Sequence, residues 1–207
     1  MKNKNIRSIF LAAILCITAL ALVLAGQACS SRKTYSSPPA MQIDASKSYT
    51  ATVNTTLGTF KIQLFPQESP LTVNNFVFLS REGFYDGVIF HRIIKNFMIQ
   101  TGDPAGTGSG GPGYQFADEL PPQHLYDVGI VAMANSGKNT NGSQFFICTG
   151  SQAKNLNLIP NYTQFGQVIE GMDVVQQIAS VKVVSNGYEV SQPVDPPKIK
   201  SIKITEE

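Results

Sequence analysis

After residue 48 the sequence consists mainly of short β-like segments, rich in apolar, aromatic and β-branched residues and separated by Gly, Pro, Asn and Asp. Such spacing is typical of antiparallel sheets built from many short strands. Only two segments have a helical period, and strands do not alternate with helices as they do in βαβ units. The pattern therefore predicts one mainly β domain over residues 49–207, folded as a closed antiparallel β-barrel capped by two α-helices.

The start of this domain has the clearest strand pattern. Residues 49–56 are rich in β-branched residues, and residues 59–65 alternate apolar with polar side chains. A period of two places the apolar side chains on one face of a strand. With Gly58 between them, the two segments predict a β-hairpin.

Two segments have the period of an amphipathic helix. In residues 71–81 apolar side chains recur at intervals of three and four, with Pro70 just before the segment and Gly83 just after it. Proline at the start and glycine beyond the end are helix boundary signals. A second helix is expected from Met172 to about residue 180, where apolar side chains again share one side.

Residues 1–28 have the layout of an export signal. Three basic residues precede an apolar run over residues 9–25, and small residues follow it around Gln27. The run is nearly long enough to span a bilayer, so an uncleaved membrane anchor with a cytoplasmic N-terminus is the alternative. Both interpretations place the remainder of the chain outside the cytoplasm.

Cys29 directly follows this segment and precedes two serines, an arrangement that resembles the bacterial lipoprotein signal, in which such a cysteine is lipidated. Gly26 departs from that pattern, which has an aliphatic residue three places before the cysteine. An uncleaved helix and simple secretion therefore stay open as alternatives. Residues 29–48, with many Ser, Pro, Lys and Thr residues, are expected to form a flexible tether.

The charge distribution argues against a nucleic-acid partner. The formal charge of +2 includes three basic residues before Cys29, which leaves 13 Lys and Arg against 14 Asp and Glu in the rest of the chain. That part has a balance of −1, whereas nucleic-acid binding requires a basic surface. Cys148 is the one cysteine of the predicted domain, so the domain has no internal disulfide.

The segment over residues 90–103 is the strongest candidate for chemistry, because Arg92 and Gln100 lie there among apolar residues. If the segment is a strand pair, Phe90 and Ile94 share the face of Arg92, and a glutamine within reach can orient the guanidinium. The alternative is that Arg92 only pairs with a surface carboxylate. Spacing alone leaves both open.

Other kinds of active site lack the residues they need. The chain has only two histidines and no Gly-x-Ser-x-Gly elbow, and Cys148 lies in an apolar run typical of packing. The glycines of residues 108–113 match a nucleotide-binding spacing, but Pro112 interrupts them and no helix pattern follows. No cluster has metal-ligand spacing, and no cofactor is expected.

Two blocks resemble the signature segments of the cyclophilins. They are residues 90–103, FHRIIKNFMIQTGD, and residues 133–147, MANSGKNTNGSQFFI, and they occur in this order with a glycine-rich stretch between them. The resemblance covers roughly residues 50–205. It implies an eight-stranded barrel closed by two helices, a substrate groove on the outer surface, and peptidyl-prolyl cis/trans isomerase activity.

The resemblance also implies the roles of individual residues, with Arg92 as the catalytic arginine and Gln100 as its orienting partner. Asn135 would offer main-chain hydrogen bonds to the substrate. The tryptophan that the family often has just before the rim leucine is absent, because the chain has no Trp. Cyclosporin affinity therefore does not follow from the resemblance. The implied substrate-binding residues are Phe97, Met98, Ala134, Asn135, Gln144, Phe146, Leu156 and Tyr162.

These expectations describe a monomeric enzyme that isomerises X-Pro bonds in proline-containing polypeptides and assists the folding of proteins outside the cytoplasm. The alternative is a proline-peptide binding module or holdase chaperone that does not turn its ligand over. The arginine discriminates between the two, because a pure binder needs the apolar pocket but not Arg92.

Overall fold

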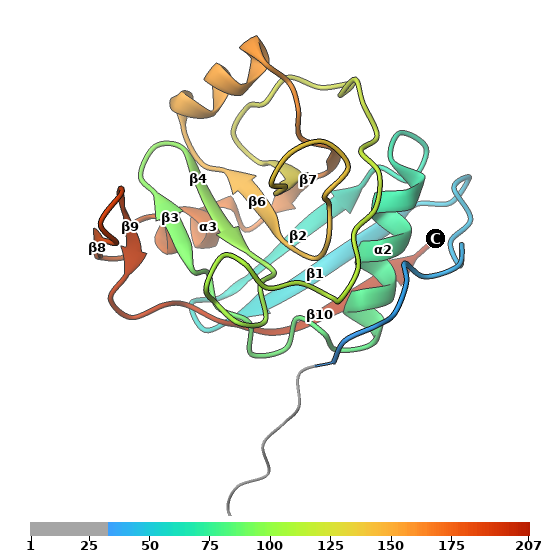
Figure 1. Ribbon diagram of the computed structural model, residues 1–207, viewed down its shortest axis with the longest axis horizontal. Coiled ribbons are helices and arrows are strands. Elements are labelled where there is room, and N and C mark those ends of the chain that lie inside the picture. The colour runs from blue at the N-terminus through green and yellow to red at the C-terminus, as the bar shows by residue number, and fades with distance from the viewer. Residues whose placement is uncertain (1–32) are drawn as a thin grey trace, which may run out of the picture. The chain divides into compact units, whose positions relative to one another are not determined.

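The computed structural model describes residues 33–207 (Figure 1). The expected signal peptide or anchor over residues 1–28 and the expected lipidation site Cys29 lie outside the described residues. Within residues 33–207 no helix has the length and apolar character needed to cross a membrane. The strands are β1 (Tyr49–Thr55), β2 (Thr59–Leu64), β3 (Arg92–Ile94), β4 (Met98–Thr101), β5 (Ile130–Met133), β6 (Phe145–Cys148), β7 (Gln164–Glu170), β8 (Val183–Ser185), β9 (Val190–Pro193) and β10 (Ile199–Glu206), and the helices are α2 (Pro70–Arg81), η1 (Ser151–Leu158) and α3 (Met172–Ala179).

Eight of these strands form one antiparallel sheet in the order β10-β1-β2-β7-β5-β6-β4-β3, which curves into a half-barrel (Figure 1). The prediction of a closed barrel is therefore wrong, because β3 and β10 are not paired as strands. Strand β3 has only three residues. The two edges are linked instead by an isolated bridge between Ile89 and Lys198 and by a hydrogen bond from the Phe90 N–H to the Pro197 carbonyl.

The two predicted helices are present, and two elements were not predicted. Helix α2 begins at Pro70, one residue before the expected start, and α3 ends at Ala179. The additional elements are the 3₁₀ helix η1 and a separate two-stranded sheet formed by β8 and β9. The additional sheet matters for the site, because it packs beside β3 at the open edge of the half-barrel.

Helix α2 is capped by a residue distant in sequence. Ser69 precedes the helix, but its hydroxyl donates to the Gln164 carbonyl and gives no cap. The carboxylate of Glu119 accepts hydrogen bonds from the main-chain N–H groups of Leu71 and Thr72, each at 2.9 Å. These are among the first N–H groups of a helix, which have no partner within it. Glu119 thereby anchors α2 to the loop that follows the glycine-rich segment.

The sheet separates two apolar clusters, and the alternation of side chains along each strand decides which cluster a residue joins. On β6, Phe145 and Ile147 belong to the main core under α2 and α3, whereas Phe146 and Cys148 face the opposite side. Strand β4 likewise directs Ile99 into the core and Met98 to the outer face. The outer cluster forms the floor of the groove described below.

Phe90 lies in the main core, so the expectation that it shares the face of Arg92 is wrong. Strand β3 begins only at Arg92, and the alternation of the strand does not extend back to residue 90. Ile94 does pack against the outer cluster, as expected.

Residues 33–48 have little regular structure, but they contact the domain. The main-chain N–H of Tyr35 donates to the carbonyl of Pro112 at 2.8 Å. Farther along, the main-chain N–H of Gln42 donates to the side-chain oxygen of Asn74 on α2 at 2.8 Å. The described part of the expected tether is thus held against the domain.

Candidate active site

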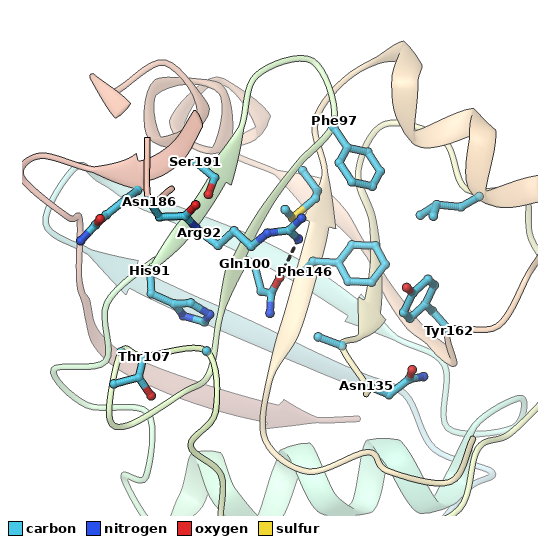
Figure 2. Close-up of a pocket in the computed structure, with 16 residues that line it drawn as sticks. His91, Arg92, Phe97, Gln100, Thr107, Asn135, Phe146, Tyr162, Asn186 and Ser191 are labelled. Atoms are coloured by element: carbon cyan, nitrogen blue, oxygen red, sulfur yellow. Dashed lines mark hydrogen bonds between the residues drawn. The ribbon is translucent and has the colours of Figure 1, made fainter. Parts of the chain in front are cut away.

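A groove of about 670 Å³ lies over the outer apolar cluster (Figure 2). Met98 and Phe146 form its floor and are almost fully buried, at 1% and 5% exposure. The Tyr162 ring meets Phe146 edge to face, with ring centroids 5.4 Å apart and an interplanar angle of 89°. Phe97 and Leu156 pack against the same cluster and border the groove. Together these side chains form an apolar slot for a small ring.

Arg92 projects into the groove beside this slot (Figure 2). Its cross-strand partner in the register of β3 and β4 is Gln100. Residues opposite each other in an antiparallel pair have side chains on the same face, close enough to interact. The Nη1 of Arg92 donates to the Oε1 of Gln100 at 3.1 Å, so the sequence-based pairing of these two residues is found in the structure.

Gln144 extends this pair into a chain of amides. The Nε2 of Gln100 donates to the Oε1 of Gln144 at 3.0 Å. The Nε2 of Gln144 in turn donates to the carbonyls of Gly108 and Gly110, at 3.0 and 2.9 Å. Gln144 therefore supports Gln100 and lines a depression next to the groove rather than the groove itself.

Arg92 also has a carboxylate partner. Its Nε donates to the Oε1 of Glu189 at 2.6 Å, and its Nη2 donates to the Oε2 at 3.0 Å. The hydrogen bonds from Arg92 hold the pKa of Glu189 below its usual value. The two alternatives left open by the sequence, an orienting glutamine and a surface carboxylate, thus both occur.

The loop that carries Gly108 and Gly110 is organised by Asp103, which is fully buried. Its carboxylate accepts hydrogen bonds from the main-chain N–H groups of Ala105, Thr107, Gly108 and Gly110, at 2.6 to 3.1 Å. Burial alone would raise the pKa of Asp103, but these four donors outweigh it and the pKa is lowered. The glycine-rich stretch is therefore a carboxylate-centred loop.

Ala134 and Asn135 lie on the other side of the slot, where both line the groove. The Ala134 N–H donates to the carbonyl of Gln144, and the Asn135 side chain donates to the carbonyl of Asn161 at 3.0 Å. Within residues 33–207 the main-chain N–H and carbonyl of Asn135 have no hydrogen-bond partner. The resemblance implies that these two groups bind the substrate, and this role stays a prediction.

Several residues of the groove escaped sequence reasoning. The lining includes His91 and the hairpin residues Asn186 and Ser191, and Glu189 contacts Arg92 from the same hairpin. The pKa of His91 is lowered, mainly by burial, and neither ring nitrogen has a hydrogen-bond partner among the described residues. The dipeptide Asn186-Gly187 is a strong turn signal that would have located the hairpin. No local pattern indicates that this hairpin reaches Arg92.

Comparison with known proteins identifies the family. The family model described as "Cyclophilin type peptidyl-prolyl cis-trans isomerase/CLD" matches residues 50–204. The chain belongs to the cyclophilin family. "Peptidyl-prolyl cis-trans isomerase-like 1" of Aspergillus fumigatus is 46% identical over 158 residues, covering 74% of this chain and 94% of that protein. "Peptidyl-prolyl cis-trans isomerase A" of Mycobacterium tuberculosis is 45% identical over 174 residues, covering 75% and 92%.

Solved structures agree with this assignment. The crystal structure of a Cryptosporidium parvum cyclophilin type peptidyl-prolyl cis-trans isomerase is similar to this cyclophilin, with a TM-score of 0.69 and 37% identity, covering 77% of this chain and 99% of that one. A second structure, of the same protein in the presence of the dipeptide Ala-Pro, has a TM-score of 0.68. The cyclophilin described here is a peptidyl-prolyl cis-trans isomerase.

Proposed function

We propose that the groove turns over X-Pro bonds with Arg92 as the catalytic residue, Gln100 as its orienting partner and the slot of Phe97, Met98 and Phe146 as the proline site. The observation that carries the proposal is the guanidinium, held by two partners at the edge of an apolar slot. An arginine side chain has five N–H groups. Three of those of Arg92 donate to other residues of the range 33–207, and the other two have no partner in that range and can meet a substrate.

The chemistry follows from amide resonance. Rotation about an X-Pro bond must break the conjugation of the nitrogen lone pair, at a barrier of about 18 to 20 kcal/mol. The lone pair can accept a hydrogen bond only when the amide is twisted. A donor placed beside the prolyl nitrogen therefore binds the transition state more tightly than either ground state, which is the requirement for catalysis.

The arginine does not suffice alone. Uncatalysed isomerisation takes tens of seconds, so a step in the millisecond range requires about 10⁴-fold acceleration, or about 5.5 kcal/mol. One hydrogen bond from a charged donor contributes about 1.5 to 3 kcal/mol. The remainder comes from the slot, which fixes the ring, and from the free main-chain groups of Asn135, which fix the flanking peptide.

A kinetic comparison tests these roles. A protease-coupled assay on an Ala-Pro-Phe peptide measures the rate for the wild type and for Arg92→Ala, with Arg81→Ala as a control that removes an arginine paired with Glu206 away from the groove. We expect Arg92→Ala to lose most of the activity and the control to lose none. Equal rates for Arg92→Ala and the wild type would refute the catalytic assignment. They would favour the alternative, in which the groove binds proline peptides or acts as a holdase site.

We also propose that this cyclophilin acts on proline-containing polypeptides outside the cytoplasm, as a monomer held at the outer face of a membrane through Cys29. The proposal is supported by the basic and apolar pattern of residues 1–28 and by the position of Cys29 directly after it. Mass spectrometry of the mature N-terminus tests it. Acyl chains on Cys29 support lipidation, whereas an intact residue 1 or an unmodified Cys29 at the N-terminus would refute it.

A further inference from the structure

The β8–β9 hairpin brings a carboxylate to the arginine of the groove. The side-chain oxygen of Asn186 stabilises the turn, because it accepts hydrogen bonds from the main-chain N–H groups of Tyr188 and Glu189, both at 3.0 Å. Gly187 supplies the positive φ of 98° that the turn requires. Because β9 packs beside β3, Glu189 faces Arg92 although 97 positions separate them in the sequence.

The pair of Glu189 and Arg92 has the strongest geometry open to two such groups. Two parallel hydrogen bonds join the carboxylate to the Nε and Nη2 edge of the guanidinium, at 2.6 and 3.0 Å. Such bidentate pairs fix the orientation of both groups. The remaining nitrogen, Nη1, donates to Gln100. Glu189 therefore limits the rotation of the guanidinium and leaves its remaining N–H groups directed to the groove.

Glu189 also changes the charge that a substrate meets. Among the described residues that line the groove, Arg92 is the one with a permanent charge, and the others are neutral apart from the titratable His91. The side chains of Arg92 and Glu189 are 36% and 32% exposed, so solvent ions partly screen the interaction of both charges with a bound peptide. With Glu189 present, the net charge of the pair is zero. Without it, the groove has an uncompensated positive charge.

We propose that Glu189 is a positioning and specificity-determining residue, which orients Arg92 and cancels its attraction for acidic side chains next to the substrate proline. This inference rests on the role of Arg92 proposed above. It follows that the wild type accepts acidic and basic flanks about equally. Replacing the carboxylate with a neutral amide of the same shape would shift the preference toward acidic flanks.

The test is a specificity ratio measured without a helper protease. NMR exchange spectroscopy gives kcat/KM on Ala-Pro peptides that carry Glu or Lys at a flanking position, on each side of the proline in turn. For a flanking charge about 8 Å away, screened as in bulk water and acting with opposite sign on Glu and Lys, we expect Glu189→Gln to raise the Glu-to-Lys ratio about fivefold on at least one flank. The rise should shrink in 1 M salt. Glu189→Asp, which keeps the charge, should keep the wild-type ratio even where its rate falls.

Glu170→Gln is the matched control, because it removes one carboxylate from an exposed ion pair with Lys61 outside the groove. A ratio for Glu189→Gln equal to that of the control would overturn the inference. So would an equal loss of activity on all peptides, which would indicate a purely structural role. Arg92→Ala is measured in parallel. Its full activity would refute the proposed function, whereas its inactivity with an unchanged ratio in Glu189→Gln would refute this inference alone.

Discussion

Asp103→Asn probes the loop that supports the active site. Asp103 is fully buried, and four main-chain N–H groups converge on its carboxylate. An asparagine of the same shape keeps one oxygen, but its NH₂ group then faces at least one of these donors. The lost partner costs about 1 to 3 kcal/mol, and the remaining hydrogen bonds become neutral and weaker. We expect a total loss of about 3 kcal/mol in the free energy of unfolding near pH 7.

The pH dependence of that loss follows from the lowered pKa of Asp103. A carboxyl group whose folded-state pKa is lowered stabilises the protein above its unfolded pKa of about 3.9, and this contribution disappears as the pH falls through the folded value. Urea denaturation at pH 7 and pH 3 measures the difference between the wild type and the variant. We expect this difference to be smaller at pH 3 than at pH 7.

Asp195→Asn is the control, because the side chain of Asp195 is exposed and has no hydrogen bond within residues 33–207. It should change stability by less than about 0.5 kcal/mol at both pH values. A difference for Asp103→Asn that is the same at pH 7 and pH 3 would contradict the account of a carboxylate held ionised by main-chain donors.

Two other changes test the groove and its floor. Gln100→Leu removes the acceptor for Arg92 and the link to Gln144. We expect kcat/KM in the isomerase assay to fall about tenfold, with KM little changed. An unchanged kcat would exclude an orienting role for Gln100. Burial raises the pKa of Cys148 to about 12, so its thiol should resist a disulfide reagent at pH 8 and react only at the rate of unfolding. Rapid labelling of the native protein would contradict the position of Cys148 in the floor of the groove.

Local patterns predicted the parts of this cyclophilin whose causes are local. The period-two alternation predicted the β1–β2 hairpin, and the three-and-four spacing predicted α2 and α3 to within one or two residues. The family resemblance named residues that the structure does bring to one groove, with Gln144 just beside it. Their catalytic and binding roles stay predictions until variants are measured.

The errors concern contacts between distant parts of the chain. Closure of the barrel depends on whether β3 meets β10, and nothing in a three-residue segment specifies its neighbour across the edge. The partnership of Arg92 with Glu189 depends on where the hairpin packs, which is a tertiary property. The unpaired edge of β3 and the contact between Arg92 and Glu189 lie at the same edge of the sheet, where the β8–β9 hairpin packs.

The contacts of residues 33–48 have a consequence for the proposed attachment through Cys29. If Cys29 is the point of attachment, only residues 30–32 separate it from residues 33–48, which lie against α2 and the glycine-rich loop. The four residue steps from Cys29 to Lys33 span at most about 14 Å even when fully extended. The enzyme would then stay in a thin layer next to the lipid headgroups. It would meet polypeptides that leave the membrane, rather than those already released into the surrounding medium.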